Sequence, residues 1–179
     1  MFTRKEALAR FGSDYQIKKR VREGKLFQLD RGIYSESETV PELAVIFRKY
    51  PRAVLTMESA FYFHGLTDVV PDEYELATER NAPKISDKKI RQYFVPEEFF
   101  DIGVSEVKTG GYPLRVYDRE RMLIELLRFQ SKFPFDYYKE VLHNYRKRLP
   151  ALNIQKIQDY ALSAPNSRIV SKRLQAEVF

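Results

Sequence analysis

Residues 11–35 read FGSDYQIKKRVREGKLFQLDRGIYS, a strongly cationic segment bounded by glycines and followed by two short apolar runs. Five Lys or Arg side chains lie between Lys18 and Lys25. Ser13 is a typical residue just before a helix, and Gly24 is a typical residue just after one. The stretch therefore predicts a cationic helix that ends near Gly24 and leads into a β-hairpin.

The residues around this helix extend the pattern. Thr3 and Glu6 have the spacing of a capping box, which predicts a first helix that ends at Gly12. After the cationic helix, LFQL and IY flank 30–32 (Asp-Arg-Gly), which predicts a hairpin with a three-residue turn. Helix, turn, helix and hairpin form the layout of a winged helix-turn-helix. We expect this domain at residues 1–38, with a polar linker at its end.

The charge of the chain is concentrated in the same region. Residues 1–35 hold nine Lys or Arg and four Asp or Glu, so they carry +5 of the formal net charge of +6. The remaining 144 residues are almost neutral. Such asymmetry is typical of a surface that meets a polyanion.

The cationic helix has two chemically distinct sides. At 100° per residue, Ile17 and Val21 share one side, which predicts that this side faces the core. In a helix-turn-helix the opposite side enters the DNA major groove. Arg31 lies at the hairpin tip, where a wing would reach DNA. A solvated helix surface is the alternative, but the layout and the local charge favour double-stranded DNA. The predicted DNA-binding residues are Tyr15, Gln16, Lys18, Lys19, Arg22 and Arg31.

The pattern changes after the linker and predicts a second, α+β unit at residues 39–179. A helix is expected over 41–50, and another is expected between Thr56 as its cap and Gly65 as its stop. Asp118 is expected to cap the first of four helices that fill the C-terminal end. The predicted strands are 73–78, 90–95, 104–109 and 114–118.

Composition limits the remaining possibilities. The chain has no Cys, which excludes disulfides and thiolate metal sites. No run approaches the roughly 18 apolar residues of a membrane span, and the charged start has no apolar signal region. We therefore expect a soluble, cytoplasmic protein without a membrane partner, a metal or another cofactor.

Two enzyme hypotheses can be stated from the residues. Gly12-Ser13 resembles the loop of a nucleotidyltransferase, but only one carboxylate, Asp30, follows it, and a two-metal site needs a pair. Asp72 with Glu106 and Lys108 matches the skeleton of a metal-dependent PD-(D/E)xK nuclease. Asp72 lies in a turn-like VVPDE segment rather than on a strand. We expect that the protein is not an enzyme, with the nuclease as the alternative.

A protein-interaction module without DNA specificity is a third possibility. It would use Tyr137, Tyr138 and Tyr145, although aromatic residues of this kind more often form core. The cationic run 146–148 is either a solvated helix end or an extension of the DNA surface. His64, just before Gly65, is expected as a helix C-terminal cap that favours the dipole.

Four segments carry a resemblance to a known family: REGKLFQLDRGIYS (22–35), VLTMESAFYFHGLTD (54–68), EYELAT (73–78) and LRVYDRERMLIELLR (114–128). In their order and spacing they resemble the AbiEi-type antitoxin family of type IV toxin–antitoxin (abortive infection) systems. The resemblance covers most of residues 3–130 and implies an N-terminal winged helix that represses its own promoter, expected to carry an inverted repeat. It also implies a C-terminal domain that neutralises a nucleotidyltransferase-like toxin without requiring a stable complex.

Overall fold

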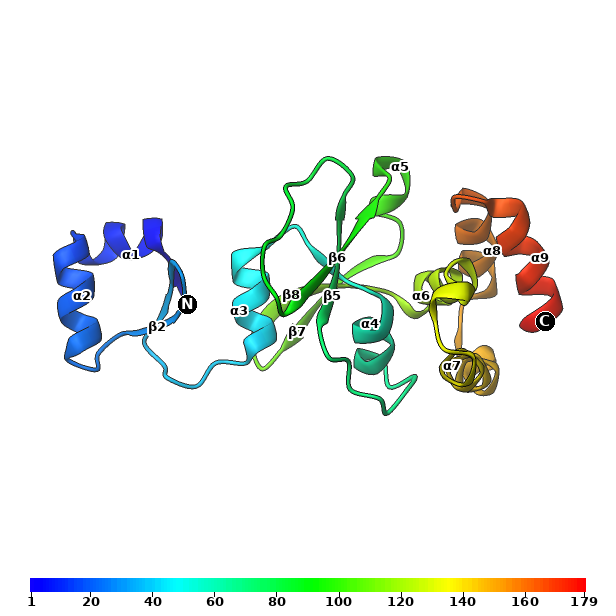
Figure 1. Cartoon of the computed structure of the whole chain (residues 1–179), viewed down its shortest axis with the longest axis horizontal. Coiled ribbons are helices and arrows are strands. Elements are labelled where there is room, and N and C mark those ends of the chain that lie inside the picture. The colour runs from blue at the N-terminus through cyan, green and yellow to red at the C-terminus, as the bar shows by residue number, and fades with distance from the viewer. The chain divides into compact units, whose positions relative to one another are not determined.

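The computed structural model describes residues 1–179 as a mixed α+β protein with nine α-helices and two sheets (Figure 1). It divides into two compact units. The N-terminal unit comprises Met1–Arg52 and Val107–Leu114, and the C-terminal unit comprises Ala53–Glu106 and Arg115–Phe179. The N-terminal unit thus continues past residue 38, because the helix that follows the linker belongs to it.

The N-terminal unit contains the expected helix, turn, helix and hairpin, together with a short first strand. Its small sheet is antiparallel in the order β1-β3-β2. The strand β1 was not predicted, because two residues give no alternation and its partner lies about thirty residues away. The elements are β1 (Phe2–Thr3), α1 (Arg4–Phe11), α2 (Asp14–Arg22), β2 (Phe27–Asp30), β3 (Ile33–Ser35) and α3 (Glu42–Lys49).

A small apolar core holds α1, α2 and the hairpin together. Ala7, Ile17 and Leu26 are each at most 2% exposed and form its centre. The partly buried side chains packed around them include Phe11 and Val21. One residue from each helix and one from the start of the hairpin therefore fix the orientation of α2.

The hairpin turn is tighter than expected. Asp30 pairs with Ile33 inside the ladder, so only Arg31 and Gly32 form the turn. The additional residue, Leu29, makes an irregularity between the Gln28–Tyr34 and Asp30–Ile33 pairs. The predicted three-residue turn was therefore wrong by one residue, since the bulge shifts the register before the turn begins.

The second sheet has five strands in the order β6-β5-β4-β8-β7. The central β4 runs antiparallel to β5 and parallel to β8, while β5 and β6 are parallel over six pairs. All four predicted strands are present, and the two-residue β4 was not predicted. The elements up to its last strand are β4 (Val54–Leu55), α4 (Met57–Phe63), β5 (Tyr74–Glu79), β6 (Ile90–Val95), α5 (Glu97–Phe100), β7 (Val104–Thr109) and β8 (Tyr112–Tyr117).

Four helices complete the C-terminal unit, as expected, and cluster together in yellow to red in Figure 1. The first of them is buried along residues 121–127, so it forms the centre of the cluster. No helix combines the length and the apolar character needed to cross a membrane. The helices are α6 (Arg119–Arg128), α7 (Phe135–Arg148), α8 (Ile154–Ser163) and α9 (Ser167–Glu177).

Candidate nucleic-acid interface

Local interactions at both ends define α2. At its start, the Ser13 hydroxyl accepts a hydrogen bond from the backbone N–H of Gln16 at 3.3 Å. The Gln16 side chain does not complete a capping box, so its amide stays available at the surface. At the other end, Gly24 adopts φ +67°, and the N–H groups of Gly24 and Lys25 bond to carbonyls of the last helical turn. This is a Schellman motif, which only glycine satisfies without strain.

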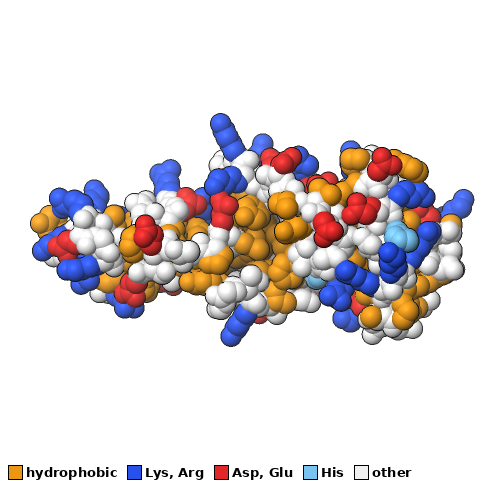
Figure 2. Space-filling view, turned by 90° about the horizontal axis from the view of Figure 1, so that it is seen from below, with side chains coloured by type: hydrophobic (Ala, Val, Ile, Leu, Met, Phe, Trp, Pro, Cys, Tyr) orange, Lys and Arg blue, Asp and Glu red, His pale blue; other side chains and the backbone are white.

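All six side chains predicted to bind DNA are exposed. Ile17 is 2% exposed and anchors the opposite side of α2, and Tyr15 is 65% exposed near the start of the helix. Figure 2 shows Lys and Arg side chains projecting over the N-terminal part of the chain, with Asp and Glu interspersed. The structure therefore brings five of the six onto one helix surface, and the sixth, Arg31, lies at the hairpin turn.

Intramolecular ion pairs distinguish the cations of this surface. Glu23 lies 3.9 Å from the Lys19 ammonium and 2.9 Å from that of Lys25. The hydrogen bond from Lys25 lowers the pKa of the Glu23 carboxyl. By contrast, Lys18, Arg22 and Arg31 form no ion pair within the protein. Their charges remain available for an anionic partner.

Two ion pairs connect α3 to the rest of the N-terminal unit. Arg48 contacts the Glu6 carboxylate, and this hydrogen bond lowers the pKa of Glu6 to about 2. Lys49 lies 2.8 Å from Asp30 beside the hairpin turn, and this hydrogen bond raises the Lys49 pKa. Asp30 also accepts a hydrogen bond from the backbone N–H of Arg31 at 2.5 Å. The backbone that carries Arg31 is thus held in place while its guanidinium stays exposed.

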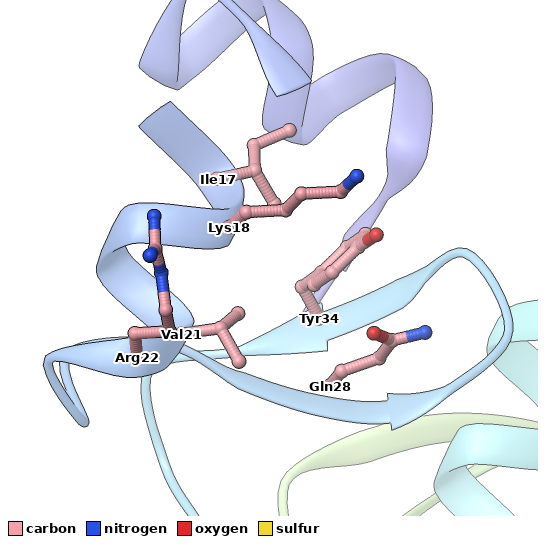
Figure 3. Close-up of a pocket in the computed structure, with 6 residues that line it drawn as sticks. All are labelled: Ile17, Lys18, Val21, Arg22, Gln28 and Tyr34. Atoms are coloured by element: carbon pink, nitrogen blue, oxygen red, sulfur yellow. The ribbon is translucent and has the colours of Figure 1, made fainter. Parts of the chain in front are cut away.

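A hollow of about 510 Å³ lies between α2 and the hairpin (Figure 3). In Figure 3, Lys18 extends from α2 on the same side as Tyr34 and Gln28, and Arg22 stands beside Val21. Gln28 and Tyr34 are direct partners across β2 and β3. No Asp or Glu lines the hollow. Its lining residues are Ile17, Lys18, Val21, Arg22, Gln28 and Tyr34.

Sequence reasoning missed Gln28 and Tyr34 as members of this surface. The available signal was a single polar position, Gln28, between two apolar neighbours in the predicted strand. That signal shows that Gln28 is exposed, but not that it lies beside a cationic helix. The register of β2 on β3 places Gln28 opposite Tyr34, and both residues line the hollow beside α2.

The residues of the nuclease hypothesis do not converge. Asp72 precedes β5 in a turn, whereas Glu106 and Lys108 lie on β7. Two strands, β4 and β8, separate β5 from β7 in the sheet. At about 4.8 Å per strand, β5 and β7 are roughly 14 Å apart across the sheet, an arrangement that does not favour a shared metal ion. Ser13 and Asp30, from the nucleotidyltransferase hypothesis, act as a helix cap and as an ion-pair partner.

The aromatic and cationic residues of α7 are mostly structural. Tyr138 and Tyr145 are 1% and 0% exposed, so they form core rather than a docking surface. Arg146 donates to the Glu177 carbonyl, and Arg148 donates to the carbonyls of His64 and Gly65. Two of the three cations in the run 146–148 therefore cap the ends of other helices.

His64 is the C-cap residue of α4, as expected, but it does not supply a positive charge at the helix end. Its ring is partly buried, and its Nε2 lies 2.7 Å from the Tyr117 carbonyl oxygen. Burial lowers the pKa of the imidazole, which favours its neutral form. The guanidinium of Arg148 supplies the positive charge at this helix end instead.

Comparison with known proteins leaves this interface to be interpreted from its own geometry. The relevant features are the exposed side of α2, its unpaired cations and the adjoining hollow. No family model matches the chain, and no curated protein is significantly similar to it.

Proposed function

We propose that the N-terminal unit is a winged helix-turn-helix that binds double-stranded DNA, with α2 in the major groove. The observation that carries this proposal is the pairing pattern on α2. Lys18 and Arg22 lie one turn apart on an exposed side and have no carboxylate partner. An α-helix of this kind fills a major groove about 12 Å wide, where phosphates line both edges.

The proposed contacts divide into two classes. Tyr15 and Gln16, at the start of α2, are placed to read base edges, because the N-terminal residues of a recognition helix approach them first. A Gln side chain can donate to and accept from adenine at the same time. The cations Lys18, Lys19, Arg22 and Arg31 neutralise phosphates, which positions the protein without reading sequence.

We further propose that this DNA binding represses the protein's own promoter at an inverted repeat. The resemblance to AbiEi-type proteins supports this and a second role, as the antitoxin to a nucleotidyltransferase-like toxin in the cytoplasm. In that proposal the C-terminal unit neutralises the toxin without a stable complex and without catalysis. The scattered positions of Asp72 and Glu106 favour this role over a nuclease.

The test is a salt titration of binding to two duplexes, one spanning the sequence upstream of the gene and one scrambled. If four cations neutralise about four phosphates, log K should fall with log salt at a slope of about −3.6 per chain. Lys18→Ala should flatten the slope by about 0.9 and weaken both duplexes equally. Gln16→Ala should instead reduce the preference for the upstream duplex.

Lys147→Ala is the matched control for these variants. Lys147 is an exposed cation on α7 with no ion pair, so its loss changes the net charge by the same amount as Lys18→Ala. It should leave both the slope and the preference unchanged. Equal salt slopes for Lys18→Ala and wild type would place the DNA surface elsewhere and return α2 to a solvated helix.

A further inference from the structure

The hollow between α2 and the hairpin combines two kinds of surface. Its floor is apolar, formed by Ile17, Val21 and the ring of Tyr34. Its rim carries hydrogen-bond donors: the Lys18 ammonium, the Gln28 amide and the Tyr34 hydroxyl. An apolar floor with donors at the rim suits a ligand that is both apolar and anionic.

The proposed position of α2 determines what would face this hollow. A helix with its side chains is about 10–12 Å across, close to the width of the major groove. The space directly beside such a helix is therefore occupied by one of the two sugar–phosphate strands that bound the groove. The hollow lies on that flank, between α2 and the hairpin.

We propose that the hollow seats one nucleotide of the DNA backbone, with its deoxyribose against the apolar floor and its phosphodiester at the rim. The inference rests on the proposed function and assigns Gln28 and Tyr34 as phosphate contacts beside Lys18. Charge complementarity supports this occupant, since two cations and no carboxylate line the hollow. Because Gln28 and Tyr34 are paired across the strands, they hold one phosphate from the hairpin side.

Neutral phosphate contacts have a signature that cationic contacts lack. A neutral side chain that bonds to a phosphate adds affinity but releases no counterion. Tyr34→Phe and Gln28→Ala should each weaken binding to the upstream and scrambled duplexes by roughly tenfold. The salt slope should stay at the wild-type value, whereas Lys18→Ala flattens it.

The controls are Tyr62→Phe and Gln158→Ala, which change exposed residues of the same types in the C-terminal unit. Neither should alter binding. A scan of the upstream duplex with single methylphosphonates should then find a phosphate whose neutralisation weakens wild type but adds little loss to Tyr34→Phe. Such non-additivity marks a shared contact.

The outcomes separate this inference from the proposed function. If wild type prefers the upstream duplex but Tyr34→Phe and Gln28→Ala bind as wild type does, the hollow holds no backbone and the DNA-binding proposal stands. If wild type binds both duplexes equally weakly at every salt concentration, the proposed function itself fails. A change in salt slope for Tyr34→Phe would also overturn the inference, because it would indicate a displaced cation.

Discussion

Arg121 is a fully buried cation whose hydrogen-bond and ionic partners all lie in the C-terminal unit. Its Nε donates to Glu125 at 2.9 Å, and its Nη1 donates to the carbonyls of Phe99 and Ile102 at 2.6 Å each. The guanidinium also stacks on the rings of Phe99 and Tyr117, with its central carbon 3.5 and 4.2 Å from their centroids. This single side chain therefore joins α5, the loop after it, β8 and α6.

Removing this side chain should strongly destabilise the protein. Arg121→Ala leaves the buried Glu125 with Arg128 as its remaining ionic partner and removes the donor to the buried Phe99 carbonyl and the partly buried Ile102 carbonyl. Breaking a buried pair of this kind costs about 3–5 kcal/mol of unfolding free energy. Urea denaturation followed by circular dichroism measures the loss. Arg119→Ala, two residues earlier and exposed, is the control and should stay within about 0.5 kcal/mol of wild type.

The sequence could not distinguish Arg119 from Arg121. Both lie in the first turn after a correctly predicted cap, Asp118, which accepts a hydrogen bond from the Arg121 N–H at 2.8 Å. Helix periodicity suggests a buried position for residue 121, but an arginine there conflicts with ordinary burial preferences. The position of Arg121 depends on the Phe99 ring and on the carbonyls of Phe99 and Ile102, about twenty residues away, and the local sequence pattern contains no information about them.

At the scale of elements, helix starts were predictable where the cap is local. Thr3, Ser13 and Asp118 all accept the expected backbone hydrogen bond. Thr56 does not, and its hydroxyl points to the Met122 sulfur instead. In the first turn of α4, the backbone N–H of Glu58 instead donates a hydrogen bond to the buried Glu75 carboxylate at 2.6 Å. Thr56 therefore occupies the predicted N-cap position, but its predicted side-chain hydrogen bond is absent, because an acceptor supplied by a strand elsewhere in the chain has no sequence signature.

The ion pair between α1 and α3 should make the N-terminal unit sensitive to acid. The folded pKa of Glu6, about 2, lies below its ordinary value of 4.5. A carboxyl with a lowered pKa stabilises the fold above its ordinary pKa and loses that contribution as pH falls toward the folded pKa. The melting temperature of wild type should therefore exceed that of Glu6→Gln at pH 6, and the difference should shrink between pH 4.5 and about pH 2.

Glu6→Gln is the suitable variant because glutamine can still complete the capping box with Thr3. The change thus removes the charge on Glu6 while keeping the helix start. Since both partners are partly exposed, high salt should reduce the difference at pH 6 as well. A melting difference that is independent of pH would contradict the ion-pair explanation.

For the whole molecule, the sequence was sufficient for the α+β class and for the order of the main elements. It also placed the six proposed contacts on an exposed surface, because helix periodicity depends only on local spacing. It was not sufficient to predict which residues of different strands lie near one another. The separation of Asp72 from Glu106 follows from sheet order, and the place of Gln28 follows from hairpin register.

Because the chain folds into two compact units, the two proposed activities should be separable by mutation. If the N-terminal unit represses the promoter and the C-terminal unit neutralises the toxin, a double Lys18→Ala, Arg22→Ala variant should lose repression and keep neutralisation. Both side chains are exposed and unpaired, so their removal should leave the fold intact. Arg121→Ala should instead lose neutralisation, because it removes buried contacts of the C-terminal unit.

The measurement combines a promoter–reporter assay with growth during coexpression of the proposed nucleotidyltransferase-like toxin. Immunoblots must show equal amounts of wild type and the double variant, because lower abundance would imitate a functional loss. Growth arrest in the presence of abundant wild-type protein would refute the antitoxin role. Loss of both activities in the stable double variant would contradict the assignment of one activity to each unit. Lys18 and Arg22 would then be needed for toxin neutralisation as well as for promoter repression.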